Sequence, residues 1–169
     1  ADSNQSFLMP EEEEDDRKTT LEGGDIMVVS DNHLLVGVSE RTSAEAAAMI
    51  TNVMFEKGLM EKVTIVRIPK KRDYMHIDTI FTQIKRNVWV LLGSLGKTNE
   101  QAKKDFIWDE LGQRPIHEEL LIKQFYKEDG EVKYRNFDNL EDLLRYISEK
   151  DLKSMEPVQF VYSGNNLFP

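Results

Sequence analysis

Short apolar runs separated by polar turns recur along the chain, and the first three of them surround a stretch with helical spacing. Mostly apolar residues occupy 25–29 and 33–38, with the polar turn 30–32 between them. A further apolar run at 63–68 is closed by a proline. Short runs of this kind, bounded by turn residues, are typical of strands. The pattern therefore predicts a ββαβ unit over residues 21–69.

The helix of this unit is expected to begin at a capping box and to end at a glycine. In the box, the Thr42 hydroxyl accepts a hydrogen bond from the first turn, and Glu45 reaches back to the cap. Gly58 marks the end, because glycine readily adopts the left-handed conformation that follows a helix. The apolar positions at helical spacing are Ala47, Ile50, Val53 and Met54.

A second unit with the same order of elements is predicted over residues 70–169. Asp138 is suited to cap its helix. Before that helix, residues 120–126 and 131–135 flank Asp129-Gly130, and both turn residues tolerate a positive φ, which favours a hairpin. The strands and the helix of the unit are expected at 79–82, 88–92, 140–147 and 158–162, whereas residues 93–119 predict no element.

The two units align at an offset of 53 residues. Asp25 then falls on Asp78, and Leu35 falls on Val88. Repeated units bury their apolar faces against neighbouring units, and two units are few for that purpose. We therefore expect the chain to be part of a larger assembly.

Much of the net negative charge lies near the N-terminus of the chain. The 169 residues include 22 Lys and Arg against 31 Asp and Glu, which gives a net charge of −9. Residues 11–16 are all acidic, so residues 1–20 are expected to form an acidic flexible arm that serves only as a solvated linker. An acidic chain without a basic cluster argues against nucleic-acid binding and against an anionic membrane surface.

Other absences narrow the class of protein further. No apolar run approaches the ~20 residues needed to cross a bilayer, and no signal-peptide pattern opens the chain. The chain has no cysteine, which excludes a disulfide, a thiolate metal site and a cysteine nucleophile within these residues. We expect a soluble, cytoplasmic protein with one ordinary core.

Two acidic clusters are candidates for chemistry. Glu22-Gly23-Gly24-Asp25 directly precedes a predicted strand, where its glycines let the backbone turn and present two carboxylates. In Met75-His76-Ile77-Asp78, strand alternation would put His76 and Asp78 on one face, as a general acid/base beside a carboxylate. A tight acidic turn, a structural histidine and an imidazole–carboxylate metal site are the alternatives for these clusters.

Arg41 is the third candidate, because it lies just before the capped helix. Free N–H groups and the helix dipole favour an anion there, and a guanidinium can bind a carboxylate with two hydrogen bonds. The alternative is an exposed arginine in a surface loop. His33 and His117 lack comparable neighbours, and Trp89 and Trp108 are expected in the core.

Together, three stretches of the chain resemble the arginine deiminase family of guanidine-modifying enzymes. They are Glu22-Gly23-Gly24-Asp25, Gly37-Val38-Ser39-Glu40-Arg41-Thr42-Ser43 and Met75-His76-Ile77-Asp78-Thr79-Ile80-Phe81-Thr82. Their order and rough intervals are those of the family. The resemblance covers roughly residues 21–92.

This resemblance implies an α+β fold, the pentein-like α/β propeller built of ββαβ units, with about two of its five blades in this chain. It also implies hydrolysis of arginine to citrulline and ammonia without a metal or an organic cofactor. His76 would be the general acid/base, and Glu22 would grip the substrate guanidinium or orient the imidazole. Asp78 would also grip the guanidinium, and Arg41 would hold the α-carboxylate of free arginine.

One departure from the family changes the expected activity. The Cys-His-Glu site of the family needs a cysteine that attacks the guanidinium carbon, and this chain contains none. The family also has a further guanidinium-binding aspartate upstream of the position of Glu22, in blades that this chain lacks. We therefore expect these 169 residues to carry half a site and to be inactive alone, as an internal fragment of a deiminase or a shortened paralogue.

Three other interpretations stay open. They are a non-catalytic arginine-binding or interaction protein, a related amidinotransferase, and a metal-dependent hydrolase that uses His76 and the carboxylates. The expected ligand is a small guanidine such as arginine. Because two blades leave open sheet edges, the expected protein partners are further copies of the chain or the missing blades of the same protein.

Overall fold

A computed structural model describes residues 19–69, 74–92 and 120–163 of the chain. The strands are β1 (Ile26–Ser30), β2 (His33–Val38), β3 (Lys62–Arg67), β4 (Phe81–Lys85), β5 (Val88–Leu92), β6 (Leu121–Glu128), β7 (Glu131–Phe137) and β8 (Gln159–Ser163). The helices are α1 (Ala44–Glu56) and α3 (Leu140–Tyr146), and α3 continues into a π-helical turn, Ile147–Asp151. Two short 3-10 turns, Gly23–Asp25 and Ile77–Thr79, precede β1 and β4.

Two mixed sheets organise the described residues. One has the strand order β1-β2-β3-β6-β7, and the other has the order β4-β5-β8. In each sheet an antiparallel hairpin is extended by a parallel strand that follows a helix, β3 after α1 and β8 after α3. The predicted ββαβ order therefore occurs twice, and mixed sheets with few helices fit an α+β fold.

The hairpin β6–β7 extends the first sheet, although it follows β4 and β5 in the chain. β6 pairs antiparallel with β3, from Lys62 opposite Tyr126 to Arg67 opposite Leu121. The turn between β6 and β7 is formed by Asp129-Gly130, both with positive φ, which confirms the predicted hairpin. Residues 70–169 thus contribute strands to both sheets.

Strand pairing fixes the offset between the two units. Equivalent pairs are Ile26↔Val36 with Phe81↔Leu91, and Ser30↔His33 with Lys85↔Val88. The offset is therefore 55 residues (81 − 26 and 91 − 36), and the predicted value of 53 is wrong. An irregularity in register recurs at the matching place of both hairpins. Asp25 and Asp78 do not occupy equivalent positions.

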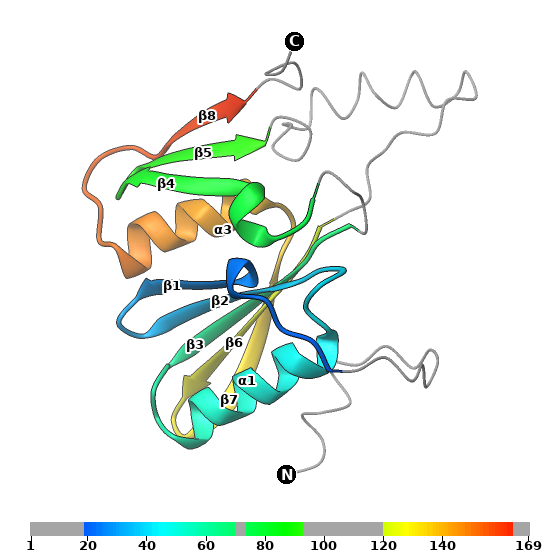
Figure 1. The fold of residues 1–169 in the computed structure, drawn as a ribbon. Coiled ribbons are helices and arrows are strands. Elements are labelled where there is room, and N and C mark those ends of the chain that lie inside the picture. The colour runs from blue at the N-terminus through cyan, green and yellow to red at the C-terminus, as the bar shows by residue number, and fades with distance from the viewer. Residues whose placement is uncertain (1–18, 70–73, 93–119, 164–169) are drawn as a thin grey trace, which may run out of the picture.

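The layers follow from the alternation of side chains along the strands. Figure 1 shows α3 between the two sheets and α1 against the opposite face of the first sheet. The larger core fills the space around α3 and includes Leu35, Val66, Trp89, Leu91, Ile122, Leu143, Leu144 and Ile147. The smaller core lies under α1 and includes Leu34, Val36, Ala47, Phe55, Val63, Ile65 and Phe125. Trp89 is only 1% exposed, which confirms its predicted place in the core.

The N-cap of each helix lies one residue after the predicted cap. Ser43 caps α1, and its side chain accepts from the Ala46 N–H. Asn139 caps α3 in the same way, because its side chain accepts from the Asp142 N–H. The predicted caps, Thr42 and Asp138, are therefore wrong. Serine, threonine, asparagine and aspartate are all good cap residues, so neighbouring candidates compete and the entry angle of the chain decides.

A buried polar cluster joins the π-helical turn to the first sheet. Asp151 Oδ2 lies 2.7 Å from His33 Nδ1, and its other oxygen pairs with Lys62 Nζ. His33 Nε2 lies 2.7 Å from the Thr64 hydroxyl, which also accepts from Gln124 Nε2. The side chains of His33 and Asp151 are 0% and 1% exposed. This cluster makes His33, expected to be ordinary, a buried structural residue.

Several predictions fall on parts of the chain outside the described residues. These are most of the acidic arm, Trp108, His117 and the segment 93–119. Within the described ranges, no helix is both long and apolar enough to cross a membrane.

Candidate functional site

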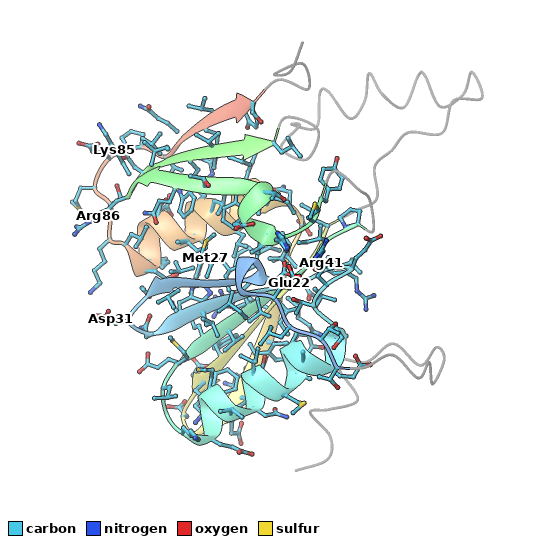
Figure 2. The ribbon with its side chains drawn as sticks, in the orientation of Figure 1. Glu22, Met27, Asp31, Arg41, Lys85 and Arg86 are labelled. Atoms are coloured by element: carbon cyan, nitrogen blue, oxygen red, sulfur yellow. The ribbon has the colours of Figure 1, made fainter. Side chains whose placement is uncertain are left out.

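Glu22 reaches the site from the segment that leads into β1. The backbone N–H of Glu22 donates to the Thr42 hydroxyl at 3.1 Å, and its carbonyl accepts from the Asp25 N–H, also at 3.1 Å. These bonds hold the turn before β1 against the loop that follows β2. Arg41 lies in that loop, so two ends of the same hairpin bring Glu22 and Arg41 together. In Figure 2 both lie to the right of the hairpin turns, which are marked by Asp31 and Arg86 at the left of the view.

His76 and Asp78 come from the segment that leads into β4. The predicted strand over Met75–Asp78 is wrong, because Ile77–Thr79 forms a 3-10 turn with His76 at its N-cap position. The turn nevertheless leaves the two side chains close, with 3.7 Å between His76 Nδ1 and Asp78 Oδ1. The predicted proximity is thus present, but a turn produces it and strand alternation does not.

The Glu22 carboxylate lies between two cationic or basic groups. Its Oε1 accepts from the Arg41 guanidinium at 2.9 Å, and its Oε2 pairs with His76 Nε2. The hydrogen bond from Arg41, followed by that from His76, holds the pKa of the Glu22 carboxyl below its ordinary value. Glu22 is therefore ionised at neutral pH, and its carboxylate is ready to pair with a guanidinium.

The imidazole of His76 lies between two carboxylates. Its Nε2 faces Glu22 and its Nδ1 faces Asp78, so both ring nitrogens have an acidic neighbour. The ring is 19% exposed, whereas the side chains of Asp78 and Arg41 are 55% and 51% exposed. A partly exposed imidazole that is oriented by a carboxylate can move a proton to or from a bound ligand.

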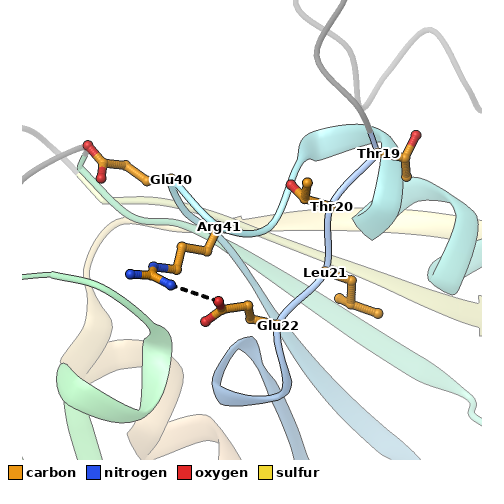
Figure 3. Close-up of a pocket in the computed structure, with 6 residues that line it drawn as sticks. All are labelled: Thr19, Thr20, Leu21, Glu22, Glu40 and Arg41. Atoms are coloured by element: carbon orange, nitrogen blue, oxygen red, sulfur yellow. Dashed lines mark hydrogen bonds and ion pairs between the residues drawn. The ribbon is translucent and has the colours of Figure 1, made fainter.

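An open hollow of about 550 Å³ adjoins one side of these residues (Figure 3). It is lined by Thr19, Thr20, Leu21, Glu22, Glu40 and Arg41. Of the predicted site residues, only Glu22 and Arg41 line it, and Figure 3 shows their side chains joined by the ion pair. A ligand in the hollow would therefore meet the Glu22–Arg41 pair first.

The glycine-rich pattern before β1 suggested that Asp25 would be a second exposed carboxylate beside Glu22, and the structure shows that it is not. Its side chain is fully buried and accepts hydrogen bonds from the Ser39 hydroxyl and from the Ile77 N–H. Sequence reasoning gave Ser39 no separate role. A small hydroxyl residue two positions before Arg41 was the available signal, because serine often bonds to the backbone a few residues on.

Across the three described ranges, no group of three or more histidine, aspartate and glutamate side chains is arranged to hold a metal ion.

Known proteins resemble this chain over most of its length. The sequence model of the family described as arginine deiminase matches residues 1–154. Arginine deiminases from Staphylococcus aureus strains JH9, Newman and COL are each 31% identical to this chain over 148 residues. The match covers 86% of this chain and 31% of each relative, so the chain spans about a third of the length of the curated relatives it matches.

Mixed sheets with few helices are compatible with the α+β, pentein-like fold of the arginine deiminase family. The chain belongs to the arginine deiminase family.

Proposed function

We propose that this chain carries the guanidinium-binding and acid–base part of an arginine deiminase-type site. The observation that carries the proposal is the ionised Glu22 carboxylate, which lies between a guanidinium and the imidazole of His76. A substrate guanidinium is chemically equivalent to the Arg41 group that Glu22 already binds. In this proposal Glu22 and Asp78 bind the substrate guanidinium, and Arg41 binds the α-carboxylate of arginine.

The proposed reaction is hydrolysis of arginine to citrulline and ammonia. A nucleophile attacks the guanidinium carbon, the bond to one terminal nitrogen breaks, and that nitrogen leaves as ammonia after receiving a proton from His76. Water then replaces the nucleophile and supplies the oxygen of citrulline. The family nucleophile is a cysteine and these 169 residues contain none, so we propose that they do not turn over arginine alone.

We further propose that the two ββαβ units are about two of the five blades of a propeller. In the described residues, β1 and β7 are the edge strands of the first sheet, and β4 and β8 are those of the second. Edge strands carry unpaired backbone groups that favour pairing with further strands. The proposed partners are the remaining blades of the same protein or further copies of the chain, which light scattering would detect as a mass above 19.6 kDa.

Arginine binding tests the proposed function without requiring turnover. In calorimetry, we expect L-arginine to bind the chain and the change Glu22→Gln to weaken binding about tenfold or more, because a charge-assisted hydrogen bond is lost. Glu40→Gln is the matched control, since Glu40 also lines the hollow and the change removes the same charge. Absence of heat with the unaltered chain, or equal weakening by both changes, would contradict the proposal.

The Arg41–Glu22 pair leads to a second prediction, in which two ligands respond in opposite directions. Arg41→Gln removes the proposed carboxylate clamp, so we expect L-arginine to bind about tenfold more weakly. The same change frees the Glu22 oxygen that Arg41 occupies, so methylguanidinium, which has no carboxylate, is expected to bind up to about fivefold more tightly. The gain is small because exposed pairs contribute at most ~1 kcal/mol. Parallel changes for both ligands, measured by calorimetry, would argue against these roles.

A non-catalytic arginine-binding protein is the second candidate function, because Glu22, Asp78 and Arg41 could bind arginine without any nucleophile. The two functions differ in the product. Citrulline formed when the chain is supplied with the cysteine-bearing part of a family member would support the deiminase, whereas transfer of the amidine to an added amine would indicate an amidinotransferase. Binding without either product would support the binding protein.

A further inference from the structure

Asp25 is a fully buried carboxylate beneath the candidate site. Its Oδ2 accepts from the Ser39 hydroxyl at 2.7 Å, and its Oδ1 accepts from the Ile77 backbone N–H at 3.0 Å. Ile77 directly follows His76 and begins the 3-10 turn that presents it. One side chain of the first unit therefore fixes the backbone beside the imidazole of the second unit.

The same carboxylate reaches the Arg41 loop through Ser39. The Ser39 oxygen accepts from the backbone N–H groups of Arg41 and Thr42, at 3.1 and 3.2 Å. The Thr42 hydroxyl in turn accepts from the Glu22 N–H, and the Asp25 N–H donates to the Glu22 carbonyl. The backbone at or next to Glu22, Arg41 and His76 is thus held by one continuous hydrogen-bond network, and Asp25 is its branch point.

Two glycines make room for this arrangement. A Cβ at Gly37 would lie 2.6 Å from Asp25 Oδ1, which is closer than real contacts allow. A Cβ at Gly24 would lie 2.9 Å from Cγ of the His76 ring. The backbone approaches both the buried carboxylate and the imidazole too closely for any side chain at these positions. The spacing between Asp25, the Ile77 turn and His76 is therefore set by close packing as well as by hydrogen bonds.

We propose that Asp25 is the positioning residue of the guanidinium site, which it assembles through Ser39 and Ile77 without touching the ligand. That the site binds a guanidinium rests on the proposed function. That Asp25 arranges Glu22, Arg41 and His76 does not rest on it. Fixed hydrogen bonds to neighbouring backbone determine how precisely a site is held, and small misplacements weaken binding strongly.

The first arm of the test needs no ligand. Histidine-labelled chain is compared by NMR as the unaltered protein, as Asp25→Asn and as Glu22→Gln, and the His76 ring is assigned by its loss in His76→Gln. If Asp25 positions the site, the chemical shifts of the His76 ring in Asp25→Asn move towards those in Glu22→Gln, because the contact with Glu22 is lost. Ser39→Ala, which keeps the buried carboxylate, is expected to move them in the same direction by less, and it decides the matter if Asp25→Asn does not fold.

A core variant separates positioning from general stability. Leu143→Ala removes a fully buried side chain of α3, a helix that takes no part in the hydrogen bonds around Asp25 described above, and it is expected to lower the melting temperature without moving the His76 shifts. If both Asp25→Asn and Ser39→Ala lower the melting temperature and leave the His76 shifts unchanged, Asp25 is only a structural residue and the proposal is wrong.

The second arm measures the binding of L-arginine by calorimetry. We expect binding about tenfold weaker in Asp25→Asn and unchanged in Leu143→Ala. Unchanged binding in Asp25→Asn would overturn the positioning role for the ligand site. If the unaltered chain binds no arginine, the proposed function fails, and the NMR arm alone decides whether Asp25 arranges these residues.

Discussion

Replacing Asp151 by alanine is expected to lower the free energy of unfolding by about 3–5 kcal/mol, the range for breaking a buried ion pair from one side. Asp151 is 1% exposed and faces both His33 and Lys62, which are 0% and 15% exposed. Its removal leaves an ammonium group and an imidazole in a nearly dry environment without their acceptor. Unfolding by urea, followed by circular dichroism, measures the loss.

Glu149→Ala is the matched control for this change. Glu149 lies on the same π-helical turn as Asp151 and is exposed, so its removal is expected to change the free energy of unfolding by less than about 0.5 kcal/mol. A loss of similar size in the two variants would mean that the turn itself is sensitive and that the buried pair is not the cause.

The pair also sets a pH dependence. Burial opposes ionisation of Asp151, but the hydrogen bonds from His33 and Lys62 outweigh it, so the pKa of Asp151 lies below its ordinary value. Because the unfolded pKa is the higher one, the stabilisation is complete above about pH 4 and is lost as the pH falls through the folded value. The difference in unfolding free energy between the unaltered chain and Asp151→Ala should therefore shrink below about pH 4.

Truncation of Trp89 is the second large effect. Trp89→Ala is expected to cost about 3–5 kcal/mol, because the ring fills the core between the second sheet and α3. The indole N–H donates to the Ser148 hydroxyl at 2.7 Å, and the ring meets Phe81 edge to face with 5.9 Å between centroids. Urea unfolding again provides the measurement.

Two further variants test whether packing or the hydrogen bond causes the loss of stability in Trp89→Ala. Trp89→Phe keeps an aromatic ring but leaves the buried Ser148 hydroxyl without its donor, so it is expected to cost less than Trp89→Ala. Met155→Ala alters a side chain that is 98% exposed and should leave the stability unchanged. Equal losses for Trp89→Phe and Trp89→Ala would assign the effect to the hydrogen bond and would contradict the packing argument.

Local patterns predicted the elements better than their pairing. Apolar runs placed the strands and Asp129-Gly130 located a hairpin, because these signals depend on neighbouring residues alone. The pairing of β6 with β3 joins residues about sixty positions apart, and no local signal encodes it. The offset of 53 was wrong for a related reason, since matching residue types at Asp25 and Asp78 do not reveal the register of the strands.

The candidate site divides in the same way. Glu22, His76 and Arg41 were found from residue type and spacing, and the structure brings both His76 and Arg41 into contact with Glu22. The buried position of Asp25 could not be predicted, because a carboxylate beside two glycines reads equally well as an exposed turn. Its partners, Ser39 and Ile77, come from a separate loop and a separate unit, so only the folded chain reveals them.

The placement of the β6–β7 hairpin has a consequence for how the protein is made. On the ribosome, β1, β2 and β3 emerge well before Glu128, the last residue of β6, which pairs with β3. Until then the edge of β3 stays without the strand that covers it, and the nascent chain carries an open template for pairing with other chains. Synthesis that stalls between β3 and β6 would therefore leave an aggregation-prone intermediate.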